Sequence, residues 1–176
     1  MAIYTGADQI TAADTRYVKW VGKLKGGGSA QIELEKAICR SNPDWKFEEK
    51  NETTPELEFE GLYTDEKLAA DDRTEPWKLT LPDNLKAGND EIILGVGKFY
   101  IGNTKADAEL VGLTRGGGSF VVERELRDIN ADDDPGSVEG RISKDSGRPK
   151  LKLTALQWLS KVAKLYPAIK ETTATT

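Results

Sequence analysis

The 176-residue sequence contains no histidine, and Cys39 is its only cysteine. A single cysteine cannot form a disulfide within the chain, and without histidine the chain cannot build a Cys/His zinc cluster. The same absence excludes the Ser-His and Cys-His pairs with which many enzymes activate a nucleophile. Because most routes to catalysis are closed, we predict that the protein is not an enzyme and binds no metal and no cofactor.

Long apolar runs and an excess of positive charge are also missing. No stretch approaches the roughly 20 apolar residues that a membrane-spanning helix requires, so we predict no membrane segment. Residues 1–15 lack the basic region and apolar stretch of a secretory signal, and we expect the protein to stay in the cytoplasm where it is made. The 25 basic and 30 acidic residues give a net charge of -5, which argues against a surface that grips nucleic-acid phosphates.

Glycine is present and is concentrated in a repeat. Residues 21–35 and 111–125 are identical at eight of fifteen positions, where average composition would give roughly one. Both segments contain Gly-Gly-Gly-Ser, and the glycines are Gly26, Gly27, Gly28, Gly116, Gly117 and Gly118. The match indicates an internal duplication, and the alternative is chance convergence on a glycine-rich hairpin.

A second pair of segments extends the repeat. Residues 55–62 and 149–156 share a pattern of Pro, Leu, apolar residue and Leu. We therefore predict a single domain, residues 1–176, built from two similar half-units. The half-units are residues 16–81 and 91–166, and residues 82–90 form the linker between them.

The residues around the glycines predict strands. Aromatic and β-branched runs at 17–21 and 97–101 precede the two clusters, and residues 30–38 and 119–129 follow them. Because glycine permits positive φ, each cluster is expected to form a hairpin or a sharp corner between two strands.

Strict alternation marks two further strands. Leu57 and Phe59 alternate with glutamates, and Leu151 and Leu153 alternate with lysines, so each strand has one apolar and one charged face. Shorter strands are expected at residues 77–81 and 91–96. We therefore predict a mainly β fold, a β-sandwich or barrel with one or two flanking α-helices.

Two helices are expected, one in each half-unit. Thr64 can cap a short helix over residues 65–70, which has acids in its first turn. Thr154 can cap a longer helix over residues 155–166, whose apolar residues recur at helical spacing until Pro167 ends it. Flexible ends are expected at residues 1–15 and 167–176.

The possible chemical motifs are weak. A phosphate-binding loop needs Gly-Lys-Ser/Thr, whereas Ala30 or Phe120 follows the glycines and serine here. Asp132, Asp133 and Asp134 are consecutive and do not follow the alternating spacing of a calcium loop, so we expect an acidic hairpin tip without a metal. Finally, four glutamates at i and i+2 positions of predicted strands are expected to form a solvated row of acids, namely Glu33, Glu35, Glu123 and Glu125.

The second half-unit resembles a type of bacteriophage major tail tube protein. The resemblance lies in residues 94–101 (LGVGKFYI), residues 111–125 (VGLTRGGGSFVVERE) and the following stretch from Asp128 to Arg141. It covers about 60 residues, and it reaches the first half-unit only through the internal repeat.

The resemblance implies a structural virion protein, made in the host cytoplasm and located in the virion tail. Subunits of such a tube self-assemble into stacked hexameric rings, the inner sheet continues into neighbouring subunits, and the tube conducts DNA into the host cell. Its partners would be copies of itself, the tape measure, the tail terminator, distal tail or baseplate proteins, and transient DNA in the lumen.

The resemblance also assigns roles to the acidic residues. An acidic lumen repels phosphate and lets DNA slide, so Glu33, Glu35, Glu123 and Glu125 are candidates for the lumen face. Asp132, Asp133 and Asp134 are candidates for a loop that contacts an adjacent ring. Replacing Glu123 and Glu125 by Lys should slow DNA delivery without stopping assembly.

Three alternatives remain open on the sequence. The repeated glycine segment raises one alternative to the body of the tube, a ring-forming tail component of pseudo-symmetric design such as a completion or hub-proximal protein. A β-sandwich glycan- or protein-binding module of a phage tail or baseplate would use exposed aromatics such as Trp45 or Trp77. An enzyme would have to be a carboxylate-based hydrolase, with buried acids of raised pKa.

Overall fold

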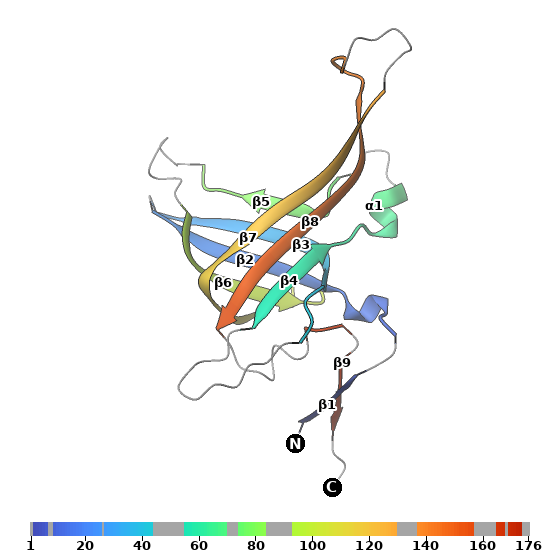
Figure 1. Ribbon diagram of the computed structural model, residues 1–176. Helices are drawn as coiled ribbons and strands as arrows, with labels where there is room; N and C mark the ends of the chain where they lie inside the picture. Colours follow the sequence, from blue (N-terminus) through green and yellow to red (C-terminus); the bar gives the residue numbers. More distant parts are fainter. Residues whose placement is uncertain are drawn as a thin grey trace.

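The computed structural model describes residues 2–6, 9–25, 27–43, 55–69, 74–83, 93–129, 137–156, 165–167 and 169–173. Most of these residues lie in β-strands, which confirms the mainly β prediction (Figure 1). The elements are β1 (Ala2–Gly6), η1 (Ala12–Asp14), β2 (Arg16–Leu24), β3 (Ser29–Cys39), β4 (Glu56–Gly61), α1 (Asp65–Ala69), β5 (Trp77–Thr80), β6 (Ile93–Gly102), β7 (Glu109–Asp128), β8 (Ile142–Leu156) and β9 (Ile169–Thr173).

Six of the strands close into a ring. Their order is β2-β6-β7-β8-β4-β3, every neighbouring pair is antiparallel, and β3 pairs back onto β2. The predicted sandwich or barrel is therefore a barrel, in which closure removes most free sheet edges. A seventh strand, β5, pairs with residues 31–34 of β3, while β4 pairs with residues 37–39 of the same strand.

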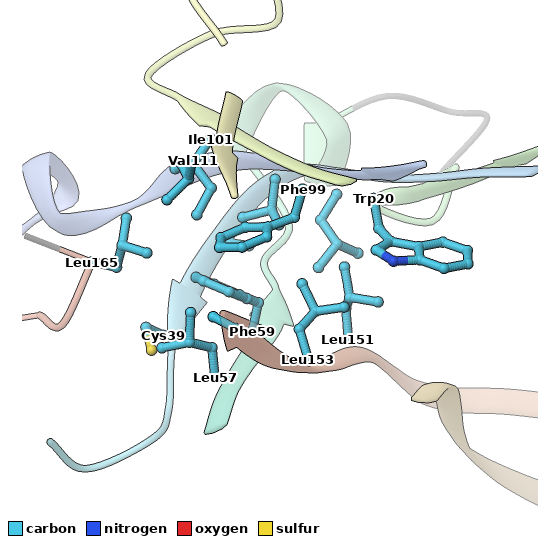
Figure 2. Close-up of a cluster of buried hydrophobic side chains, with 14 of the residues drawn as sticks. Trp20, Cys39, Leu57, Phe59, Phe99, Ile101, Val111, Leu151, Leu153 and Leu165 are labelled. Carbon is cyan, nitrogen blue, oxygen red and sulfur yellow. The ribbon is translucent and has the colours of Figure 1, made fainter. Parts of the chain in front are cut away.

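Apolar side chains at alternate strand positions fill the barrel. Leu57 and Phe59 of β4 and Leu151 and Leu153 of β8 are at most 2% exposed, which matches the predicted alternation. Figure 2 shows them gathered around Phe99, which β6 contributes from the other side of the barrel. Each fully buried side chain of this size contributes about 1.5–3 kcal/mol, so the barrel interior is the main source of stability.

A pair of glycines makes room for Trp20 in one region of this interior. Gly22 of β2 lies directly opposite Gly97 of β6, and the indole of Trp20 lies over both. A Cβ atom at Gly22 would come within 2.0 Å of the Trp20 ring, and one at Gly97 within 2.3 Å. No larger residue fits at either position while the indole stays in place, because the barrel interior is close-packed.

The two glycine clusters do not have the same structure. Gly27 and Gly28 lie in the turn between β2 and β3 with φ of 95° and 79°, values that glycine tolerates far better than other residues. Gly116, Gly117 and Gly118 lie inside β7 and not at a corner between strands, so this part of the prediction is wrong. The backbone there forms a bulge, since Thr114 pairs with Ala155 and Gly118 with Leu153. Gly26 lies outside the described residues.

The matched segments of the repeat accordingly differ. Residues 21–35 form the β2–β3 hairpin, whereas residues 111–125 lie within the single strand β7. Residues 56–61 and 150–156 are both in strands, β4 and β8, which pair with each other. In the predicted linker, residues 84–90 lie outside the described part of the chain.

One predicted helix is present and the other is wrong at its start. α1 begins after Thr64, whose Oγ1 accepts a hydrogen bond from the Lys67 amide at 3.3 Å. Thr154 does not cap a helix, because residues 154–156 continue β8 and Ala155 is fully buried there. Pairing with β4 and β7 outweighs the helical spacing of the sequence, and residues 157–164 lie outside the described part.

Within the segments predicted to be flexible ends, the structure describes two short strands. β1 and β9 pair with each other as a two-stranded antiparallel sheet, with Ala2 opposite Thr173 and Gly6 opposite Ile169. Residues such as Ile, Tyr and Thr favour strands once a partner is present. Just before β9, Leu165 and Tyr166 pack into the hydrophobic core and attach this end to the barrel.

Candidate assembly surface

β7 and β8 extend well beyond the barrel (Figure 1). β6 pairs with β7 only through residues 109–113, and β4 pairs with β8 only through residues 150–154. Beyond those positions, residues 122–128 of β7 and 142–149 of β8 pair with each other and with no further strand of the described chain. We call this two-stranded ribbon the arm. An isolated two-stranded ribbon is marginally stable in water, so its edges are suited to pairing with another chain.

The far half of the arm exposes apolar side chains. Leu126 is 61% exposed and Ile142 is 54% exposed. The register places Leu126 opposite Lys144 and Asp128 opposite Ile142, so the two apolar residues are diagonal neighbours on one face. Ile129, which is 52% exposed, follows directly after β7. Exposed apolar groups that gather in one place are typical of interaction sites.

A carboxylate and an aromatic contact attach the arm, and the part of β7 just before it, to the barrel. Glu75, just before β5, accepts hydrogen bonds from Lys144 of β8 and from the Trp77 indole, and its carboxylate lies 3.7 Å from Arg124 Nε of β7. The Trp77 and Phe120 rings pack edge to face with centroids 5.3 Å apart. Sequence analysis missed Glu75, because its partners are about 50 and 70 residues away and no local pattern marks it.

Glu33 is enclosed on the wall of the barrel and does not face solvent. The residue is 6% exposed, and its carboxylate accepts hydrogen bonds from Lys105 Nζ at 2.9 and 3.2 Å, with Lys19 Nζ at 3.7 Å. Burial alone would raise the pKa of Glu33, but Lys105 and Lys19 outweigh burial and hold the pKa below its ordinary value of 4.5. Burial and the nearby Glu33 carboxylate raise the pKa of Tyr17.

Glu35 lies at a bulge of β3 and is paired with a helix. Arg16 pairs with Ala37 but Val18 pairs with Leu34, so β3 has one residue more than β2 in this interval. The Glu35 carboxylate lies 2.8 Å from Lys67 Nζ of α1. This acid therefore joins two elements of the same subunit.

Glu123 and Glu125 are exposed on the outer face of the arm. Glu123 forms an ion pair with Lys150 Nζ at 2.8 Å, and Glu125 accepts a hydrogen bond from Ser146 Oγ at 3.3 Å. The Glu123 carboxylate raises the pKa of Lys150. Because a lysine of β8 pairs with Glu123, this face of the arm is mixed in charge.

The four predicted acids do not form one row within the subunit. Glu33 and Glu35 are on β3 and Glu123 and Glu125 are on β7, and these strands are three positions apart in either direction around the closed sheet. Asp132, Asp133 and Asp134 belong to the connection between β7 and β8 and lie outside the described residues. Within the described residues, no group of three or more acids or cysteines is placed to hold a metal ion.

Comparison with known proteins does not assign the chain to a family. No family model, no curated protein and no solved structure matches the chain. Across the part of the chain that the structure describes, no helix has the length and apolar character needed to cross a membrane.

Proposed function

We propose that the protein is a structural subunit that assembles with copies of itself, as stacked hexameric rings, into the tail tube of a bacteriophage. The observation that carries this proposal is the arm, with its unpaired strand edges and its exposed Leu126 and Ile142. The phage context comes from the sequence resemblance. In this setting the tube conducts DNA, and the further partners are the tape measure, the terminator and the distal tail or baseplate proteins.

The closed barrel restricts how neighbouring subunits can join. A sheet that continues from one subunit into the next needs strands with free hydrogen-bonding groups. In the described residues such groups lie on both edges of the arm, on the outer edge of β5 and on the edges of the β1–β9 pair. Pairing through the edges of the arm would bring a neighbouring subunit against Leu126 and Ile142 and satisfy the backbone groups at the same time.

The lumen role is now proposed for two of the four acids. Glu123 and Glu125 are exposed and can present charge to DNA, although Lys150 balances Glu123. Glu33 is buried between lysines, and Glu35 is paired with Lys67. An acidic lumen would therefore need Glu123 and Glu125 from many copies of the subunit.

The competing functions receive less support. Trp77, a candidate for glycan binding, packs against Phe120 and donates its indole hydrogen to Glu75, while Trp45 lies outside the described residues. A carboxylate-based hydrolase needs an acid with raised pKa, whereas the pKa values of the enclosed Glu33 and Glu75 are lowered.

The test is size-exclusion chromatography and negative-stain electron microscopy of the purified protein at high concentration. For the parent protein we expect hollow rings or tubes of uniform width. For the double variant Leu126→Asp with Ile142→Asp we expect a folded monomer, because a charge at these two positions opposes their burial between subunits. Leu110→Asp is the matched control, since Leu110 is 43% exposed but lies on the barrel. Parent protein that stays monomeric, even after seeding with tail-tip components, would overturn the proposal and favour the binding module.

A further inference from the structure

The angle between arm and barrel depends on few contacts. Inside the barrel, β7 and β8 are each held by a second strand, but along the arm each pairs only with the other among the residues that the structure describes. No described strand therefore holds the inner face of the arm, which continues the face of Phe120 and Leu151. Side chains that reach across to this face must determine where the arm points.

Glu75 is such a side chain. Lys144 and Arg124 both lie on the inner face of the arm, one on each strand, and both approach the Glu75 carboxylate. The absence of a side chain at Gly147 leaves room for the Lys144 side chain, since a Cβ atom at residue 147 would come within 2.9 Å of Lys144 Nζ. One carboxylate thus contacts both strands of the arm and, through the Trp77 indole, β5 as well.

The backbone that bears Glu75 is itself fixed to the barrel. The Glu35 amide donates a hydrogen bond to the Pro76 carbonyl at 3.4 Å. Lys67 Nζ donates to the Glu75 carbonyl at 3.4 Å and to Thr74 Oγ1 at 3.3 Å while it pairs with Glu35. A continuous set of contacts therefore leads from β3 through α1 to Glu75 and then to the arm.

The surroundings of Glu75 favour a functional contact over an incidental surface pair. Its side chain is only 19% exposed, and exposed ion pairs usually contribute little because water screens them. Burial would raise the pKa of Glu75, but the hydrogen bonds from Lys144 and Trp77 and the charge of Arg124 hold the pKa below its ordinary value. The carboxylate is therefore ionised at neutral pH and can hold two cations.

We infer that Glu75 is a positioning residue that sets the angle of the arm, with Glu35 and Lys67 as its support. The contacts stand on the structure alone, and only their consequence for assembly rests on the proposed function. In that setting, a fixed arm presents its edges to a neighbour without a further loss of conformational entropy, which favours association.

Hydrogen exchange of the unassembled full-length protein at low concentration tests this inference. In Glu75→Gln, which keeps an acceptor for the Trp77 indole, we expect the amides of residues 122–128 and 142–148 that pair across the arm to exchange roughly tenfold faster or more, as loss of a charged hydrogen bond would produce. Amides of the barrel, such as those of Phe59 and Phe99, should keep their rates. Glu123→Gln is the matched control, because it removes an ion pair on the outer face of the same arm.

Lys144→Gln provides a second variant, since Lys144 is partly exposed and its loss removes the arm side of the contact. It should reproduce the arm-specific change. Unchanged arm rates in both variants, or equal acceleration of arm and barrel, would overturn the inference, because Glu75 would then have no effect or a general one. These rates do not depend on tube formation, so a protein that never assembles would end the proposed function while leaving this result interpretable.

Discussion

β7 and β8 run through both the barrel and the arm, yet the two regions differ in what supports them. Within the barrel, Leu151 and Leu153 of β8 face a filled interior and are 2% exposed. Further along the same hairpin, Leu126 and Ile142 are more than half exposed, although they are equally apolar. The difference teaches that burial here depends on an opposing layer of residues and not on the strand sequence itself.

The two regions also differ in the kind of interaction that holds them. The barrel depends on apolar area removed from water, an effect of about 25 cal/mol per Å². The base of the arm depends on Glu75 with its two cations and on one aromatic contact. We therefore expect substitutions in the barrel to change global stability and substitutions in the arm to change local motion and assembly.

Truncating the centre of the barrel should have the largest effect. Phe59 is 1% exposed and lies in the core cluster, so Phe59→Ala should lower the free energy of unfolding by about 3–5 kcal/mol, through lost burial and the cavity left behind. Leu126→Ala, the matched truncation on the arm, should change it by no more than about 0.5 kcal/mol. Urea denaturation followed by tryptophan fluorescence measures both variants.

Equal losses in the two variants would break the comparison. Such a result would mean that the arm folds as part of the same cooperative unit and that Leu126 is covered in solution. Measurement at several protein concentrations separates that outcome from assembly, because burial between subunits depends on concentration and burial within a subunit does not.

Sequence analysis correctly identified the strands whose apolar side chains all point into the barrel interior. Alternation in β4 and β8 gave the right buried faces, since period two and one apolar face are sufficient for that inference. The prediction from the glycine repeat was wrong for the second cluster because the same residues can form two structures. Gly27 and Gly28 form the turn between two paired strands, whereas Gly116, Gly117 and Gly118 form a bulge in β7, whose partner β8 continues past them. The acids misled for a related reason: charge along a strand does not reveal which lysines lie across from it.

The tertiary contacts at Glu75 illustrate the same limit. Lys67, Arg124 and Lys144 come from three separate segments, and nothing in their local sequence connects them to Glu75. Only the order of strands around the barrel brings them together. Sequence analysis predicts a hairpin with an acidic tip in this part of the chain, but the unpaired edges of the arm depend on where β6 and β4 stop pairing, which has no local signal.

The glycines under Trp20 offer an intermediate test of the barrel. Gly22→Ala places a methyl group where the indole lies, so unfolding free energy should fall by about 1–3 kcal/mol through overpacking. In a Trp20→Leu background the same substitution should have a clearly smaller effect, because the clash is then absent. A double-mutant cycle measured by urea denaturation checks this, and additive effects would show that the indole is not the cause.

The smallest effect contrasts two carboxylates, one on the barrel wall and one on the arm. The pKa of Glu33 is lowered in the folded protein, so its contribution to stability is present above the unfolded value of about 4.5 and is lost as pH falls through the folded pKa. We therefore expect Glu33→Gln to flatten the decline of stability between about pH 5 and pH 3 relative to the parent protein. The effect should be modest, because Lys105 is 65% exposed and stays hydrated without its partner.

Glu125→Gln is the control, since Glu125 accepts a single hydrogen bond on the exposed arm, and its profile should follow that of the parent. Thermal unfolding across this pH range measures the slopes, and a Glu33→Gln profile parallel to the other two would show that the enclosed ion pair does not couple proton binding to folding.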